Sequence, residues 1–114
     1  MPLNATTDAA FTDDVLASPL PVLVEFTAEW CPPCKTIAPV LEQIADSERD
    51  RMRVVALDVD ANPETTMKYQ VMGMPTLALF VSGEVVAQIV GARPRAAIMR
   101  ELEPHLRRSA PSVG

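Results

Sequence analysis

The chain has 114 residues, an apolar content of 48% and a formal net charge of −5 from 10 basic and 15 acidic side chains. This length favours one domain, and an acidic balance without a basic cluster argues against a nucleic-acid or anionic-membrane surface. We expect a cytoplasmic protein, because no apolar run approaches the roughly 20 residues that cross a bilayer and the first residues lack the pattern of a signal peptide.

The first half of the chain alternates helix and strand signals. A short helix is predicted over residues 9–17, capped by Thr7 or Asp8. The nearly all-apolar run over residues 20–26 predicts a strand covered on both faces. Apolar residues at a spacing of three and four then predict a helix over residues 33–47.

Proline marks the next features. Pro39 should bend the second helix, because it removes one amide and crowds a carbonyl of the preceding turn. A further strand is predicted over residues 52–59. After it, Asn62 is placed to cap a short helix that starts with Pro63 and runs to residue 69.

The pattern then changes from helical to alternating. Thr76–Val81 and Glu84–Val90 flank Ser82-Gly83, which predicts an antiparallel hairpin. A strand–helix–strand unit followed by a hairpin and a closing helix implies an α/β fold. We expect a mixed central sheet of four to five strands with helices on both faces.

Pro94 opens the closing helix. Pro104 conflicts with its straight continuation, because the residue before a proline is steered out of the α region. We therefore expect a kink or an end near Glu103. Residues 1–108 would form the domain and residues 109–114 a flexible C-terminal tail.

The only two cysteines lie three positions apart, in Trp30-Cys31-Pro32-Pro33-Cys34. Such a pair can close a disulfide or stay open as a dithiol, and no other cysteine provides a structural framework for it. In a cytoplasmic protein the spacing indicates redox catalysis or metal binding. A structural zinc or iron–sulfur half-site is the less favoured alternative, because four ligands are needed and only His105 could join in cis.

Several motifs around this pair follow one another in a familiar order. They are EFTAEWCPPCK at residues 25–35, DVDANP at 58–63, GMPT at 73–76, Phe80, Gly83, and VGA at 90–92. From residue 11 to residue 106 the chain resembles the thioredoxin family. The resemblance implies the thioredoxin fold and a dithiol–disulfide oxidoreductase that acts on disulfide-containing proteins. It also implies that no cofactor is bound, and that a flavoprotein thioredoxin reductase reduces the oxidised protein with electrons from NADPH.

The two cysteines take different roles in this interpretation. Cys31 precedes a helix whose first amides lack partners, so partial positive charge favours its thiolate. Cys31 is therefore the predicted nucleophile. Cys34, one turn into the helix and expected to be more buried, would resolve the mixed disulfide.

Pro32 and Pro33 depart from the Gly-Pro pair that is usual between thioredoxin cysteines. They remove an amide that could solvate the Cys31 thiolate and they stiffen the ring, so they should tune the redox potential, in a direction that remains open. A disulfide oxidant or isomerase is thus an alternative to the reductase. A binding or scaffold module with incidental redox activity is another.

Glu25 is an acid in an otherwise apolar strand, on the face of Leu23. Desolvation should raise its pKa and suit it as the proton acceptor for Cys34. Thioredoxins usually place Asp at this position, and a lysine that accompanies the acid in many of them corresponds here to Ala56. The alternative is a strand-end Glu turned to solvent.

The resemblance also places a cis peptide bond at Met74-Pro75, which would lay this backbone beside the cysteines. An apolar rim for extended peptides would then be formed by Trp30, Met74, Val90, Gly91 and Ala92. Met72 is interpreted as core filling. The rim is small and faces substrate, so we expect a monomer.

Overall fold

The structure is a computed structural model that describes residues 2–109, the last three by their backbone alone. Its strands are β1 (Asn4–Ala5), β2 (Val22–Thr27), β3 (Arg53–Asp58), β4 (Thr76–Val81) and β5 (Glu84–Val90). Its helices are the π-helical turn η1 (Thr12–Leu16), α1 (Pro32–Ser47), α2 (Pro63–Lys68) and α3 (Arg95–Ser109). No helix within residues 2–109 is long and apolar enough to cross a membrane.

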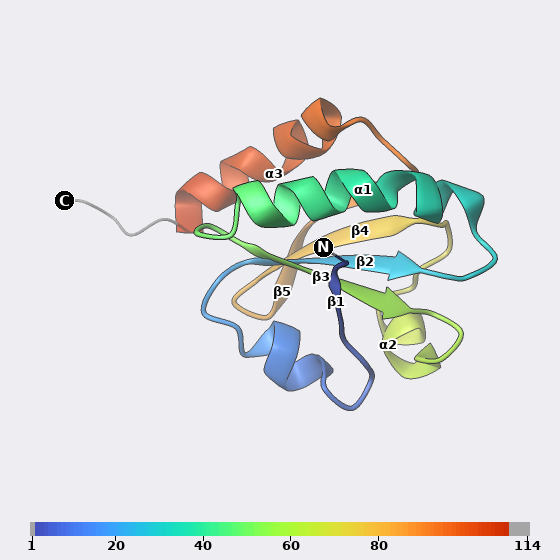
Figure 1. The fold of residues 1–114 in the computed structure, drawn as a ribbon. Coiled ribbons are helices and arrows are strands. Elements are labelled where there is room, and N and C mark those ends of the chain that lie inside the picture. Colours follow the sequence, from blue (N-terminus) through green and yellow to red (C-terminus); the bar gives the residue numbers. More distant parts are fainter. Residues whose placement is uncertain (1, 110–114) are drawn as a thin grey trace.

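The strands form one mixed sheet in the order β1-β3-β2-β4-β5. β2 pairs in parallel with β3 and antiparallel with β4, and the predicted hairpin of β4 and β5 is present. α1 and α3 cover one face of the sheet, while η1 and α2 lie on the other (Figure 1). The predicted α/β fold with helices on both faces is confirmed.

Alternation along β2 assigns its side chains to the two layers. Val22, Val24 and Phe26 pack into the cluster that also holds Phe11 of the N-terminal segment. Leu23 packs into the opposite cluster, with residues of α1 and α3. Successive strand residues point to opposite faces, so Glu25 lies in the layer of α1, as its position predicted.

α1 starts at Pro32, one residue earlier than predicted, and continues through Pro39. Prolines occupy its first two positions, where an amide would have no intrahelical partner. Ile37, Leu41 and Ile44 are buried against the sheet. This burial fixes the helix so that its N-terminal end lies at the carboxyl end of β2, beside the cysteines.

The first helix is shorter than predicted. Residues 8–10 form a turn in which the Ala10 amide donates to the Thr7 hydroxyl at 3.1 Å, and only Thr12–Leu16 is π-helical. Thr7 therefore closes a local turn. Phe11 and Val15 of this segment are nevertheless buried.

Asp8 caps a different helix from the one predicted. Its carboxylate accepts hydrogen bonds from the amides of Glu64 and Thr65, at 3.2 and 2.9 Å, in the first turn of α2. Asn62 occupies the N-cap position but its side chain makes no cap bond. It accepts instead from the Asp8 amide at 2.9 Å. These hydrogen bonds fix the N-terminal segment against the start of α2.

α3 does not end at Glu103, because it continues through Pro104 to Ser109. Ile98, Leu102 and Leu106 are buried on both sides of the proline, and this packing outweighs the hydrogen bond that Pro104 cannot make. Ser109 is helical, so a tail would begin after it. Residues 110–114 of the predicted tail lie outside the described residues.

Candidate active site

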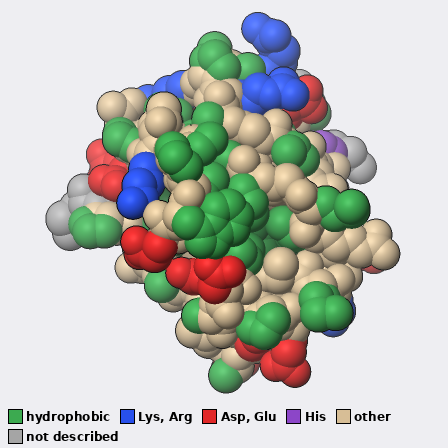
Figure 2. Space-filling view, turned by 90° about the vertical axis from the view of Figure 1, so that its right-hand side faces the viewer, with side chains coloured by type: hydrophobic (Ala, Val, Ile, Leu, Met, Phe, Trp, Pro, Cys, Tyr) green, Lys and Arg blue, Asp and Glu red, His purple; other side chains and the backbone are tan. Residues whose placement is uncertain are grey.

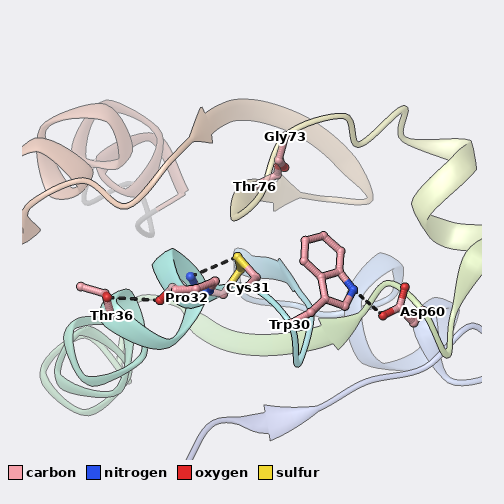
Figure 3. The surroundings of a disulfide bond; sticks show 8 residues. Trp30, Cys31, Pro32, Thr36, Asp60, Gly73 and Thr76 are labelled. Carbon is pink, nitrogen blue, oxygen red and sulfur yellow. Dashed lines mark hydrogen bonds between the residues drawn. A yellow bond between two sulfur atoms is a disulfide. The ribbon is translucent and has the colours of Figure 1, made fainter.

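The two cysteines form a disulfide at the N-terminal end of α1, with their Cα atoms 5.3 Å apart. Cys31 is the N-cap of the helix in an extended conformation, and its Sγ accepts from the Cys34 amide at 3.3 Å (Figure 3). The two intervening prolines have no amide to offer. The Cys34 amide is therefore the backbone donor that would stabilise a thiolate on Cys31.

The two cysteines differ less in exposure than predicted. Cys31 is 3% exposed and Cys34 2%, so the expected contrast in burial is absent. Both pack with Ala28, and the half-buried Val59 and Met74 pack against this cluster. Their environments still differ, because the N-cap bond reaches only the Cys31 sulfur. Helix position, not exposure, distinguishes the two thiols.

Glu25 is buried beside this pair. It is 3% exposed, and burial raises its pKa from an ordinary 4.5 to about 7. In the sheet it lies opposite Ala56 of β3 and Leu77 of β4. The predicted desolvation is confirmed, and the alternative of a solvent-turned carboxylate is wrong.

A pocket of about 230 Å³ lies between Glu25 and Cys34. Both Glu25 and Cys34 line it, together with Lys35 and Ala56. This volume holds several waters, so a proton can pass between the thiol and the carboxylate through the pocket.

The segment between α2 and β4 lies against the disulfide. The Met74-Pro75 bond is cis, as predicted, and Met74 packs against the cysteines. The Pro75 carbonyl accepts from the Gly91 amide at 2.8 Å, which joins the end of β5 to this segment. The Thr76 hydroxyl donates to the Gly73 carbonyl at 2.6 Å.

Apolar side chains gather at the centre of this face of the molecule (Figure 2). Of the predicted rim, Trp30 is 62% exposed, Val90 51% exposed and Ala92 exposed, while Met74 and Gly91 are half-buried. Met72 is 94% exposed, so its assignment to the core is wrong. It lies in the irregular segment before β4, where apolar character alone does not imply burial.

Asp60 is a contact that the sequence did not predict. Its carboxylate accepts from the Trp30 indole Nε1 at 2.7 Å (Figure 3). The bond holds the exposed ring between the cysteines and the loop after β3. Within residues 2–109, no group of three or more His, Cys, Asp or Glu side chains is arranged to hold a metal ion.

Comparisons with known proteins give consistent matches. The family model described as Thioredoxin matches residues 2–104. The chain is 55% identical to a thioredoxin of Mycobacterium tuberculosis over 96 aligned residues. The aligned region covers 84% of this chain and 83% of that protein. It is 51% identical to a thioredoxin of Mycolicibacterium smegmatis over 104 aligned residues, which cover 90% of this chain and 93% of that protein.

A longer relative is a bifunctional thioredoxin reductase/thioredoxin of Mycobacterium leprae. The chain is 53% identical to it over 96 residues, which is 84% of this chain. The match spans only 21% of the length of the bifunctional protein.

Proposed function

Because the chain belongs to the thioredoxin family, we propose that Cys31 and Cys34 carry its protein-disulfide reductase activity, with Cys31 as the nucleophile and Cys34 as the resolving thiol. The observation that supports this order is the bond from the Cys34 amide to the Cys31 sulfur at the start of α1. A donor at that position favours the thiolate of Cys31 in the reduced protein.

The proposed cycle moves two electrons from the dithiol to the substrate. The Cys31 thiolate attacks one sulfur of a protein disulfide, forms a mixed disulfide and releases the other substrate sulfur as a thiolate. The Cys34 thiolate then attacks the Cys31 sulfur, closes the Cys31–Cys34 disulfide and releases the second substrate thiolate. The substrate is reduced and the protein is oxidised.

Glu25 is proposed as the proton acceptor for Cys34. A carboxylate with a pKa of about 7 exchanges protons readily at neutral pH, and it shares a pocket with Cys34. In the reverse direction, protonated Glu25 would return the proton as the disulfide opens.

The predicted apolar rim is proposed to bind an extended segment of the substrate. Trp30, Met74, Val90, Gly91 and Ala92 would supply apolar contact, and Pro75 would keep the neighbouring backbone beside the disulfide. Pro32 and Pro33 are proposed to tune the redox potential, because they leave the Cys34 amide as the helix donor nearest to Cys31.

The electron source is part of the proposal. We propose that NADPH supplies electrons through a flavoprotein thioredoxin reductase, with no cofactor bound to this chain. The name of the Mycobacterium leprae relative supports this pairing, since it joins the two activities in one protein. A monomer of one domain over residues 1–108, acting in the cytoplasm, completes the proposal.

Insulin reduction driven by NADPH and a thioredoxin reductase tests the roles of the cysteines. Cys31→Ser should abolish turnover, and Cys34→Ser should also stop it but accumulate a mixed disulfide through Cys31. Undiminished activity of Cys31→Ser, or trapping by Cys34 in its place, would contradict the assignment. A scaffold module would show the same substrate binding in both variants and no turnover in the unmodified protein.

Equilibration with glutathione distinguishes the reductase from an oxidant. A redox potential of about −270 mV is expected for a reductase, and a potential of about −120 mV would indicate a disulfide oxidant.

A further inference from the structure

The pocket beside Glu25 is lined by more carboxylates than the proposed thiol–disulfide exchange requires. The carboxylates of Glu29, Glu42 and Asp58 line it together with Glu25. Lys35 is the one basic side chain among its described lining residues. Carboxylates therefore outnumber basic side chains in the described lining of the pocket, although Glu42 already interacts with another group.

The Glu25 carboxylate itself lacks a partner. It is 3% exposed, and within residues 2–109 it accepts no hydrogen bond and forms no ion pair. Lys35 is exposed and makes no ion pair with it. Asp58 differs, because its Oδ1 already accepts from the amides of Asp60 and Ala61 at 2.9 and 3.1 Å.

The pocket leaves space for a partner that could reach Glu25. Ala56 lies directly opposite Glu25 on the neighbouring strand and also lines the pocket, so only a methyl group occupies that side. The volume of about 230 Å³ lies below the range of about 300–1,000 Å³ for drug-sized ligands. A compact ligand with a single positive charge fits this space.

We propose that the pocket binds a small organic cation of the alkylammonium class, whose N–H groups donate to the Glu25 carboxylate above Ala56. A multivalent metal ion is disfavoured, because the carboxylates within residues 2–109 are not arranged as a metal-binding group. A free amine and a lysine side chain of a partner protein present the same group. The proposal does not depend on thiol exchange.

Binding should be coupled to the ionisation of Glu25. A cation in the pocket favours the carboxylate and so lowers the Glu25 pKa, and by linkage its affinity rises as the pH increases through about 7. Glu29 and Asp58 add attraction, and Lys35 adds repulsion. With Glu42, they are the charged side chains among the described residues that line the cavity around Glu25, and they come from α1, β3 and the loop between β2 and α1.

Carbon NMR of the Glu25 carboxyl in the oxidised protein provides the test. n-Butylammonium chloride should lower the Glu25 pKa by about 1 or more in a saturable manner. Sodium chloride and tetramethylammonium chloride at equal ionic strength should not, because neither offers an N–H donor. An equal effect of all three salts would show charge screening only and would overturn the proposal.

Two lysine variants sharpen this test. Ala56→Lys places a tethered ammonium in the pocket, so it should lower the Glu25 pKa and remove the response to n-butylammonium. Ala96→Lys adds the same charge at an exposed residue of α3 outside the pocket and should preserve that response. A retained response in a folded Ala56→Lys variant would overturn the proposed location.

Glu25→Gln provides a second measurement that does not require a lysine to be accommodated. Amide chemical shifts of the pocket residues should respond saturably to n-butylammonium in the unmodified protein and not in Glu25→Gln. N-acetyl-lysinamide as a second probe separates the sources: binding of both probes supports a protein lysine, and binding of n-butylammonium alone supports a free amine. Because these experiments use the oxidised protein, their failure would leave the insulin assay of the proposed function unaffected.

Discussion

Replacing Glu25 with glutamine should stabilise the protein above pH 7 and leave its stability unchanged near pH 4. Burial raises the pKa of Glu25 from 4.5 to about 7. Between these pH values the folded protein holds a proton that the unfolded chain releases, so the free energy of unfolding falls as the pH rises. The decrease is complete above about pH 7. Glutamine has no proton to lose and therefore avoids it.

The magnitude follows from the pKa difference. Each unit of pKa corresponds to about 1.4 kcal/mol, which gives an upper limit of about 3 kcal/mol for Glu25. The carboxylate borders a pocket that admits water, so we expect about 2–3 kcal/mol at pH 8.5. Urea unfolding of the oxidised proteins at pH 4, 5.5, 7 and 8.5 measures the difference between the variant and the unmodified protein.

Glu29→Gln is the matched control, because it removes an exposed carboxylate from the same pocket. Its effect should stay within about 0.5 kcal/mol throughout this range. If Glu25→Gln changed stability by the same amount at pH 4 and pH 8.5, Glu25 would titrate alike in both states. The reasoning from desolvation, and with it the proton-acceptor role, would then be refuted.

Three further substitutions test the packing around the site. Asp8→Ala should destabilise the protein by about 1 kcal/mol, because α2 loses its cap; urea unfolding measures this, and an unchanged midpoint would mean that the cap adds nothing. Met72→Gln should change stability by less than about 0.5 kcal/mol, since Met72 is 94% exposed; a loss above about 2 kcal/mol would restore the core interpretation. Gly73→Ala should cost about 1 kcal/mol and slow insulin reduction, because the new Cβ would lie 2.7 Å from Val90 Cγ1; normal stability and rate would show that Val90 moves freely.

Local patterns predicted most of the architecture because each element buries its own repeating apolar face. The hairpin of β4 and β5 has the predicted bounds, since alternation and a Ser-Gly turn are both short-range signals. The layer of Glu25 followed from the same alternation. The cysteine pair was predicted at the start of a helix, because prolines at the first helical positions delete amides that would have no intrahelical partner.

The differences come from contacts between distant parts of the chain. Asp8 precedes a helix signal, but its carboxylate bonds to amides 56 and 57 residues away, and no local pattern contains that information. β1 has two residues and exists only by pairing with β3. α3 continues past Pro104 because Leu106 is buried against the main core, and propensity alone does not include that contribution.

The Asp8 contact has a consequence for how the chain can be shortened. A truncated chain that begins after residue 8 would lack β1 and also the carboxylate that closes the first turn of α2. α2 follows the loop of Asp60, and Asp60 holds the Trp30 indole. Trimming the amino end should therefore loosen the tryptophan beside the disulfide, so the leading segment is better kept when the protein is fused, tagged or expressed in fragments.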